Sequence, residues 1–407
     1  MKTGLLLIFF WVSPAMAQLA VKARLVYPMT GDLAPLSDAV ILCGPDGKIQ
    51  QIGLAAALPI PAGWPVVEAA VVVPGLIDAR STVGLSGVLN WERRDQEQLE
   101  TSAPVQPELR AVDGYNGRDP LVAWLRELGV TTVHTGHAPG ALVSGQTMVI
   151  KTNRASVVDA NDLLAPVAGI SVTLGSDGFA KNDKSAPGTR AKSVALLRAE
   201  LIKAQEYLTK LQLADSSKHP DRDLHLEALV STLRREVPLI ITADRHHDIA
   251  AALRLQKEFG FRLVLDSAAE AGFMLDEIKA SQAAVIVHPT MARAVGEREN
   301  LKFTTAADLL AAGIPFAFQS GHEDYVPKTR VVLFEAAMAA AHGLPPGQAL
   351  AACTIRAAEI LGLQHKIGSL EPGKDADLAL YDGDPLETTT HCVGTIIDGR
   401  QVSKERR

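Results

Sequence analysis

PLIIT at Pro238–Thr242 begins the stretch that decides the fold. It is followed by Asp248 to Phe259 and then by Arg262 to Leu265. The first and last segments are short apolar runs of strand length, and the middle segment has the length and composition of a helix. A strand, a helix and a second strand in this order place the two strands parallel to each other. This stretch therefore predicts part of a parallel sheet that is covered by helices.

The same alternation extends in both directions. Further apolar strand candidates lie at Val130–Val133, Gly169–Leu174, Ala284–Val287 and Pro315–Phe318, and further helical stretches lie at Thr189–Leu213 and Ala306–Ala312. Strand–helix alternation over about 290 residues favours a closed (β/α)8 barrel of the TIM type over an open sheet. The predicted fold class is therefore α/β.

Both ends of the chain have a different pattern. Short strand candidates separated by turns lie at Ala39–Cys43, Lys48–Gly53, Ala376–Tyr381 and Val393–Ile397. Gly44-Pro45-Asp46-Gly47 is a strong turn signal, and Asp398-Gly399 indicates a hairpin. Two all-β ends thus enclose the alternating middle.

The composition excludes one class of partner. Apolar residues make up 47% of the chain and charged residues 21%, which is ordinary for a globular protein, and the net charge is -6. Binding of nucleic acid requires a concentrated basic face, and the sequence contains no such cluster. We therefore expect no nucleic-acid partner.

The first residues predict export. Met1-Lys2 is a short positive start, Leu5–Val12 is an unbroken apolar run, and Ala15-Met16-Ala17 has the small-x-small pattern of a signal peptidase site. The apolar run is too short for a permanent transmembrane helix. We expect residues 1–17 to be a cleaved signal peptide and the mature chain, from near Gln18, to be periplasmic or secreted without a membrane anchor. An uncleaved membrane anchor is the alternative.

Three cysteines bear on the exported form. Cys353 lies in Ala-rich helical sequence and is expected to fill the core, whereas Cys43 and Cys392 lie in the two end segments. Export would permit a disulfide between Cys43 and Cys392, but disulfide geometry is strict. The sequence leaves the pairing of these two cysteines open.

Two motifs resemble a known superfamily. Val73-Pro74-Gly75-Leu76-Ile77-Asp78 resembles the entry strand of the amidohydrolase superfamily, and Gly368–Leu378 resembles its exit segment. Gly129–Val133, Ser144–Lys151 and Thr189-Arg190 are similar to its imidazolonepropionase-like and dipeptidase-like branch. The resemblance implies a barrel at residues 76–365 and a small composite β-sandwich formed by residues 18–75 and 366–407.

The resemblance also implies a metal site. Members of this superfamily hydrolyse amide, lactam or similar C–N bonds with one or two divalent metals of the zinc type, which activate water and polarise the scissile carbonyl. The implied ligands are a His-x-His pair, often a modified lysine, two later histidines and an aspartate. In this chain those positions hold Arg80, Thr82, Ser171, Thr242, Ser267 and Gly321.

None of these residues is a good ligand for such a metal. A guanidinium is always charged and offers no lone pair, and serine, threonine and glycine do not replace imidazole at a zinc-type site. We therefore predict that the inherited metal centre is absent and that the protein needs no metal cofactor.

Other polar side chains follow strands near the predicted mouth of the barrel. They are His134, His137, Asp244, His246, His247, His288, His322, Glu323 and Asp324. One interpretation is a rebuilt metal or acid–base site, because histidine serves both roles near neutral pH. The other interpretation, which we favour, is a set of loop residues with local contacts, because ligand sets need convergent geometry.

Arg80 allows two interpretations of its own. Deep in the mouth, its permanent charge could replace that of the lost metal and pair with Asp78, Asp266 or Glu270, since a buried arginine without a partner is costly. Alternatively, the side chain extends outward into water. We expect the paired arrangement.

The sequence thus supports two functional hypotheses. The first is a non-catalytic amidohydrolase-fold protein that binds a small molecule in the barrel mouth, or that assembles with an active relative or with copies of itself. The second is an active C–N bond hydrolase with a relocated centre among His134, His137, His246, His288 and His322. We favour the first, because a fold does not by itself carry a function.

Overall fold

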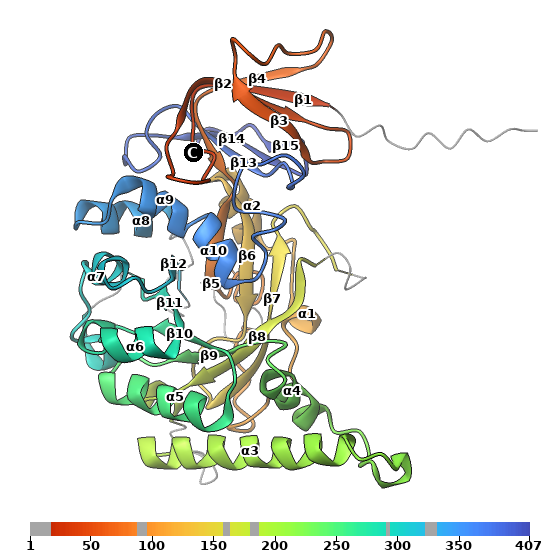
Figure 1. The fold of residues 1–407 in the computed structure, drawn as a ribbon, viewed down its shortest axis with the longest axis vertical. Coiled ribbons are helices and arrows are strands. Elements are labelled where there is room, and N and C mark those ends of the chain that lie inside the picture. The colour runs from red at the N-terminus through yellow and green to blue at the C-terminus, as the bar shows by residue number, and fades with distance from the viewer. Residues whose placement is uncertain (1–17, 88–95, 158–162, 180–186, 290–293, 322–331) are drawn as a thin grey trace, which may run out of the picture.

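The computed structural model describes residues 18–87, 96–157, 163–179, 187–289, 294–321 and 332–407. Within these ranges the chain forms two sheets, one of seven strands and one of eight. Figure 1 shows the seven-stranded sheet at one end of the molecule and the eight-stranded sheet, with its helices, filling the rest. The chain passes from the seven-stranded sheet to the eight-stranded sheet between β4 and β5.

The seven-stranded sheet combines the two ends of the chain. Its order is β15-β14-β13-β4-β1-β2-β3. The strands are β1 (Leu19–Val26), β2 (Leu36–Cys43), β3 (Ile49–Leu54), β4 (Val66–Pro74), β13 (Leu378–Tyr381), β14 (Cys392–Ile397) and β15 (Arg400–Ser403). The antiparallel pair β4–β13 joins the N-terminal part to the C-terminal part. Cys43, Cys353 and Cys392 are all buried and free, so no disulfide links the two parts.

The eight-stranded sheet is almost closed. Its order is β12-β11-β10-β9-β8-β7-β6-β5, and a bridge between Ser81 and Gly321 brings the two edge strands together. The strands are β5 (Leu76–Ser81), β6 (Val130–Gly136), β7 (Val143–Lys151), β8 (Ala165–Thr173), β9 (Leu239–Thr242), β10 (Leu263–Ser267), β11 (Ala284–Val287) and β12 (Phe316–Phe318). The predicted α/β class and barrel architecture are confirmed.

One strand departs from the parallel arrangement. β7 runs antiparallel to both β6 and β8, whereas β8 to β12 are parallel to one another. Residues 137–142, which connect β6 to β7, are too few for the crossover helix that a parallel connection needs. The alternation in the sequence did not predict this hairpin.

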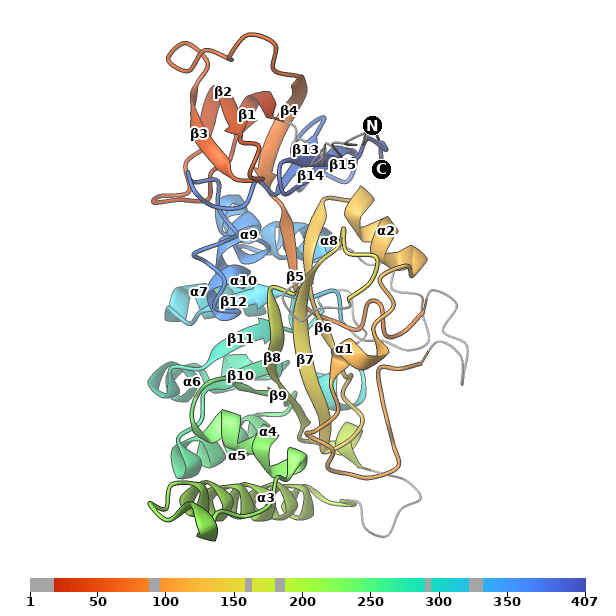
Figure 2. The same ribbon diagram turned by 90° about the vertical axis from the view of Figure 1, so that its right-hand side faces the viewer.

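The helices lie around the eight-stranded sheet, mostly on one side of it in Figure 2. They are α1 (Ala111–Gly114), α2 (Pro120–Glu127), α3 (Arg190–Leu211), α4 (Leu224–Leu233), α5 (His246–Phe259), α6 (Leu275–Ser281), α7 (Thr305–Ala312), α8 (Val332–Ala341), α9 (Pro346–Ala352) and α10 (Ile355–Ile360). The long helix α3 begins after Thr189, whose hydroxyl accepts a hydrogen bond from Lys192 N and caps the helix. Among the described helices none has the length and apolar character needed to cross a membrane.

Side chains alternate along the strands, so that a layer of buried polar residues follows a layer of buried apolar residues toward the C-terminal ends of the strands. Ile240, Val264, Ile286 and Ala317 belong to one buried cluster, which also contains Ala357 and Ala358 of α10. Side chains two residues apart on a strand point to the same face, so the next positions toward the C-terminal ends share that orientation. They are occupied by Thr242, Asp266, His288 and Gln319, all of which are buried. We call these four residues the polar layer.

Candidate functional site at the barrel mouth

The candidate site lies where β5, β8, β9, β10 and β12 end. In barrels of this type the C-terminal ends of the strands form the mouth that carries the chemistry. Arg80, Thr82, Ser171, Thr242 and Ser267 all come to this end of the sheet, and every one of them is buried. Five of the positions that the resemblance implies for the ligands therefore lie at this end of the sheet.

Arg80 lies entirely inside the mouth, with no exposed surface. One guanidinium nitrogen, Nη2, donates to Ser171 Oγ at 3.0 Å and to the carbonyl oxygen of His137. Nη1 donates to the carbonyl oxygen of Ser81 at 3.4 Å, while Nε has no partner within the described structure. The side chain thus extends from the first expected ligand position on β5 to the expected lysine position on β8.

The direct ion pair expected for Arg80 is not formed. Within the described residues its guanidinium hydrogen-bonds only to uncharged oxygen atoms, and Asp78, Asp266 and Glu270 are engaged by other donors. The alternative, an arginine extending into water, is also wrong because Arg80 is fully buried. Burial lowers the pKa of Arg80, and the nearby charges of Asp266 and Asp78 oppose that shift.

Asp78 has a separate environment on the same strand. Its Oδ1 accepts a hydrogen bond from Ser320 N at 3.0 Å, and its Oδ2 accepts one from Ser320 Oγ at 2.5 Å. Burial raises the pKa of Asp78 to about 6, although the hydrogen bonds from Ser320 oppose the shift. Asp78 therefore fastens the end of β12 to β5; it also accepts a hydrogen bond from Arg80 N at 3.3 Å but does not contact the guanidinium of Arg80.

Three members of the polar layer are joined by hydrogen bonds to Asp266. Thr242 Oγ1 donates to Asp266 Oδ2 at 2.6 Å, and Gln319 Nε2 donates to Asp266 Oδ1 at 2.7 Å. Both carboxylate oxygens of Asp266 are thus occupied by neutral donors from the neighbouring strand β9 and from the end of β12. Such a network fixes the side chains in one arrangement.

The residues just beyond the polar layer are also hydrogen-bonded to other protein side chains. Ser267 Oγ donates to Asp244 Oδ1 at 2.5 Å, and burial raises the pKa of Asp244 to about 6. Thr82 and Ser86 share a hydrogen bond of 2.9 Å between their hydroxyl oxygens. Ser267 and Thr82 are therefore each engaged by another residue of the described structure.

Gly321 cannot be replaced by an aspartate without rearrangement. Its φ of 85° lies in the region that favours glycine, and a Cβ atom there would come within 2.6 Å of Pro289 Cγ. The backbone at this position is also the partner of Ser81 in the bridge that brings β5 and β12 together. The glycine is thus required by the local packing of the barrel.

Two of the candidate histidines, His134 and His288, already hydrogen-bond to neighbouring residues. His134 is buried, with Nδ1 at 2.6 Å from the carbonyl oxygen of Ala79 and Nε2 at 2.7 Å from Thr147 Oγ1. Burial, with the charge of Arg80, lowers the pKa of His134 to about 3. His288 contacts Thr305 Oγ1 at 3.1 Å, and burial lowers its pKa to about 4. Both rings are neutral packing elements near pH 7.

His137 differs from these two. It is 7% exposed, and neither of its ring nitrogens has a partner within the described part of the chain. Burial, with the charge of Arg80, lowers the pKa of His137 to about 4. His137 is therefore a neutral imidazole beside a permanent cation, which is an unfavourable place for a metal ion.

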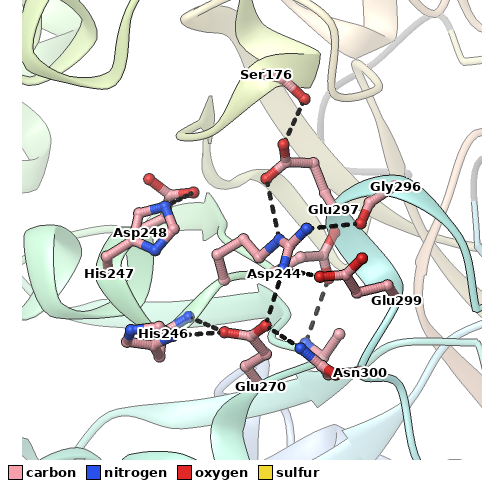
Figure 3. Close-up of polar contacts among 12 residues, drawn as sticks. Ser176, Asp244, His246, His247, Asp248, Glu270, Gly296, Glu297, Glu299 and Asn300 are labelled. Atoms are coloured by element: carbon pink, nitrogen blue, oxygen red, sulfur yellow. Dashed lines mark hydrogen bonds and ion pairs between the residues drawn. The ribbon is translucent and has the colours of Figure 1, made fainter.

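His246 and His247 lie at the start of α5, outside the polar layer. His246 Nδ1 is 2.7 Å from Glu270 Oε2, and His247 Nε2 is 3.8 Å from Asp248 Oδ2 (Figure 3). Hydrogen bonds from His246 and Asn300 outweigh burial and lower the pKa of Glu270 to about 2. His322, Glu323 and Asp324, the remaining candidates, lie outside the described residues.

An ionic network around Glu297 was not found from the sequence. Glu297 Oε2 is 2.5 Å from Arg190 Nη2. Glu297 Oε1 accepts a hydrogen bond from Ser176 at 2.7 Å (Figure 3). Arg245 donates to Glu299 at 2.6 Å and to the carbonyl oxygen of Gly296 at 2.9 Å. This network ties the loops after β8, β9 and β11 together. Its only sequence signal is charge density on separate loops, which does not specify partners.

Gln319 and Ser320 were also missed as members of the site. Both directly follow β12. Gln319 donates a hydrogen bond to Asp266, and Ser320 donates one to Asp78. Polar residues immediately after a barrel strand are the signal that would have found them.

The side chains at this mouth do not fit a zinc-type metal. The positions implied by resemblance carry a guanidinium, four hydroxyl side chains and a glycine, and the nearby carboxylates are bonded to protein donors. Within the described ranges no three His, Cys, Asp or Glu side chains are grouped so that they could hold a metal ion. As far as the described residues go, the arrangement can position hydrogen-bonding groups and one buried cation, but it offers no open ligand set.

Comparison with known proteins agrees with this fold. A model described as "Amidohydrolase family" matches residues 121–403, which is most of the chain, and the protein therefore belongs to the amidohydrolase family.

Individual relatives give the range of similarity. Amidohydrolase tasK of Hapsidospora irregularis is 24% identical over 368 residues, covering 80% of this chain and 36% of that protein. An imidazolonepropionase of Geobacillus kaustophilus is 40% identical over 83 residues, covering 19% of this chain and 20% of that protein. The alignments thus span about a third and a fifth of these relatives.

Solved structures share the fold over the whole chain. An amidohydrolase from Thermotoga maritima MSB8 superposes with a TM-score of 0.86 at 28% identity, covering 95% of this chain and 100% of that one. A putative prolidase from Bifidobacterium longum has a TM-score of 0.60 at 19% identity, covering 97% of each chain. The chain is therefore related to hydrolases of C–N bonds.

Proposed function

We propose that this protein is an exported amidohydrolase-fold protein that has lost the catalytic metal centre of its relatives and serves as a binding module or partner subunit. The observation that carries the proposal is the position of Arg80. Its buried guanidinium spans from the first expected ligand position to Ser171 at the expected lysine position. A fixed positive charge at this place repels a divalent cation and occupies the volume that the metal would need.

The surrounding residues support the same proposal. Thr242 and Ser267 donate to carboxylates, so they hold Asp266 and Asp244 within the protein framework. Gly321 has no room for an added side chain. These positions are thus engaged in internal contacts, which supports the proposal that packing has replaced a metal site.

The alternative function is hydrolysis by a rebuilt centre among His134, His137, His246, His288 and His322. His134 and His288 would each have to abandon existing contacts before their nitrogens could bind a metal or accept a proton. His246 is held by Glu270 on the outer side of the mouth. These contacts favour the non-catalytic function.

Metal analysis of the purified protein tests the proposal. After growth with zinc, manganese and iron, mass spectrometric analysis should find less than stoichiometric amounts of each metal. The His288→Ala variant is the matched control and should have the same metal content as the unmodified protein. One tightly held metal per chain that is lost in this variant would overturn the proposal and favour the rebuilt centre.

Restoring ligands provides a second test. The Arg80→His, Thr82→His variant recreates a His-x-His pair on β5, yet Ser171, Thr242, Ser267 and Gly321 remain unchanged. We expect no stoichiometric zinc in this variant, because two ligands do not complete a tetrahedral site. Full zinc occupancy would mean that the mouth still holds an intact remainder of the centre.

The proposed export and binding role have their own expected observations. Residues 1–17 should be absent from the mature protein, which N-terminal sequencing of material from the cell exterior or periplasm would detect. The partner would be a small molecule in the mouth, an active amidohydrolase relative or further copies of this chain. No metal, nucleic acid or membrane association is part of this role.

A further inference from the structure

A hollow on the outer helical layer lies away from the barrel mouth. It is formed by the facing sides of α5 and α6, which lie next to each other in Figure 1, and has a volume of about 660 Å³. Because β9 and β10 end at the mouth, the residues that follow α5 and α6, such as Gly260, lie at the opposite end. The hollow runs along both helices on their outer side and shares no lining residue with the site described above.

The floor of this hollow is apolar. Leu253 of α5 and Met274 before α6 are half-buried, and Phe261 is buried beneath them. Ala250 and Ala280 leave the space between the two helices open. A cavity of this volume with an apolar lining has the dimensions of a small-molecule site.

The rim carries an excess of positive charge. Arg235, Arg254 and Lys257 line the hollow, with Glu277 as the one acid in its lining. Arg262 and one acid, Glu359, line an adjoining hollow of about 360 Å³, which shares Arg235, Gln256 and Ser281 with the first. Within the described part of the chain none of these four cations forms an ion pair, although the whole protein carries a net charge of -6. This local excess favours an anion.

The backbone of Arg235 gives a second, independent indication. Its φ of 62° lies in the left-handed region, which is costly for a residue with a side chain. At the ends of α5 and α7 the same conformation is adopted by glycine, namely Gly260 at 74° and Gly313 at 72°. An arginine at such a position is held against its conformational preference, which makes Arg235 a candidate functional residue.

The contacts of Arg235 hold it at the rim. Its Nη1 donates to the carbonyl oxygen of Gly260 at 2.9 Å, so the guanidinium is fixed above the end of α5 while its other nitrogens have no protein partner in the described structure. Gln282, at the end of α6, has the same unusual backbone conformation with a φ of 60° and lines the adjoining hollow. Two strained residues thus present polar side chains to one surface.

We propose that this hollow binds a small amphiphilic carboxylate, with its apolar body on Leu253 and Met274 and its carboxylate on Arg235 and the neighbouring cations. The planar guanidinium matches the geometry of a carboxylate, and Arg254 and Lys257 add long-range attraction. The proposal does not depend on the loss of the metal centre, because the two sites share no residue.

Calorimetric titration of the full chain with decanoate, kept below the concentration at which it forms micelles, tests this site. The protein should bind decanoate saturably with one site per chain. The Arg235→Gly variant should bind it about ten-fold more weakly, because it loses a charged hydrogen-bond donor. The same variant should have a higher melting temperature, because glycine relieves the left-handed backbone.

Two controls separate this site from unspecific binding. Arg24→Gln, which removes an exposed arginine from β1 in the other sheet, should leave decanoate affinity unchanged. Decan-1-ol, which has the same apolar body without the charge, should bind about ten-fold more weakly than decanoate. Equal affinities in Arg235→Gly and Arg24→Gln, equal binding of the acid and the alcohol, or no saturable binding of decanoate would each overturn the proposal.

Discussion

Two buried cations, Arg80 and Lys151, are held in opposite ways. The Lys151 ammonium group is 2.7 Å from Asp375, 2.9 Å from Asp377 and 2.5 Å from Asp398, so three carboxylates surround one charge. The Arg80 guanidinium donates to a serine hydroxyl and to backbone carbonyls. The first arrangement links the barrel to the seven-stranded sheet, and the second fills the mouth.

The difference shows which inherited features serve the fold. Burial alone would lower the pKa of Lys151, but Asp377, Asp398 and Asp375 together hold it above its ordinary value. Lys151 and two of these aspartates belong to the segments whose resemblance to the amidohydrolase superfamily is strongest. At the mouth, the ligand positions that the resemblance implies hold Arg80 together with hydroxyl and glycine residues. The comparison therefore separates a charge cluster that joins the two sheets from a buried arginine that hydrogen-bonds to neutral oxygens.

The largest effect should come from breaking the Lys151 cluster. Lys151→Met removes the common partner of three carboxylates, two of which are almost fully buried. We expect the free energy of unfolding to fall by about 3–5 kcal/mol, because an uncompensated buried charge is costly. Urea unfolding near pH 7 measures this loss.

The Lys151→Arg variant is the matched control, since it keeps the charge at the same place. It should lose much less stability than Lys151→Met. If both variants lost the same amount, the shape of the lysine side chain would be responsible and the electrostatic comparison with Arg80 would fail.

The next effect is a pH dependence that arises from the mouth. The folded-state pKa of Asp78 is about 6, above its ordinary value, so the unfolded chain releases this proton at lower pH than the folded one. The stabilising contribution of protonated Asp78 is complete below about pH 4 and disappears as the pH rises through 6. Its size should be roughly 2–3 kcal/mol.

Asp78→Asn removes this contribution and so separates it from that of Asp244. Asp244 also has a pKa of about 6 and shifts stability in the same direction. Urea unfolding at pH 4, 5, 6 and 7 should therefore show a smaller fall in stability for the variant than for the unmodified protein. An unchanged fall would mean that Asp78 is ionised in the folded state throughout this range.

Sequence reasoning predicted the framework better than the contacts. The alternation of apolar runs and helical stretches predicted β8 to β12, α3, α5 and α7 close to their observed bounds, because burial imposes a period that is visible locally. The β6–β7 hairpin was not predicted, since strand direction depends on pairing and not on composition. The turn signals at both ends indicated strands but did not specify the parallel pair β1–β4.

For the site, sequence reasoning predicted positions but not partners. Arg80 was expected inside the mouth and lies there, yet its ion pair is replaced by bonds to Ser171 and to the carbonyl oxygen of His137. Asp266 was a candidate partner, but Thr242 and Gln319 occupy it. Such choices depend on side-chain geometry across strands that lie far apart in the sequence, which no local pattern records.

Arg80→Met should cost much less than Lys151→Met. The Arg80 guanidinium contacts only neutral oxygens, and the bond from Arg80 N to Asp78 is kept in the variant, so replacing the side chain leaves no carboxylate without a hydrogen-bond donor. We expect a loss of about 1–2 kcal/mol, equivalent to one or two lost hydrogen bonds. Urea unfolding under the conditions used for Lys151→Met makes the comparison direct. A loss as large as that of Lys151→Met would mean that Asp266 and Asp78 depend on the charge of Arg80 despite the lack of contact.

The smallest effect should come from Lys48, at the edge of the Lys151 cluster. Lys48 Nζ is 3.1 Å from Asp375 Oδ1, but its side chain is 42% exposed whereas that of Lys151 is 4% exposed. Water already solvates this ammonium group, and Asp375 keeps its bond to Lys151 when Lys48 is removed. Lys48→Met should therefore cost less than about 1 kcal/mol in the free energy of unfolding, and the difference should shrink further in added salt. Because both lysines contact the same aspartate, a large and salt-independent loss in Lys48→Met would show that proximity to Asp375, and not burial, determines the strength of this cluster.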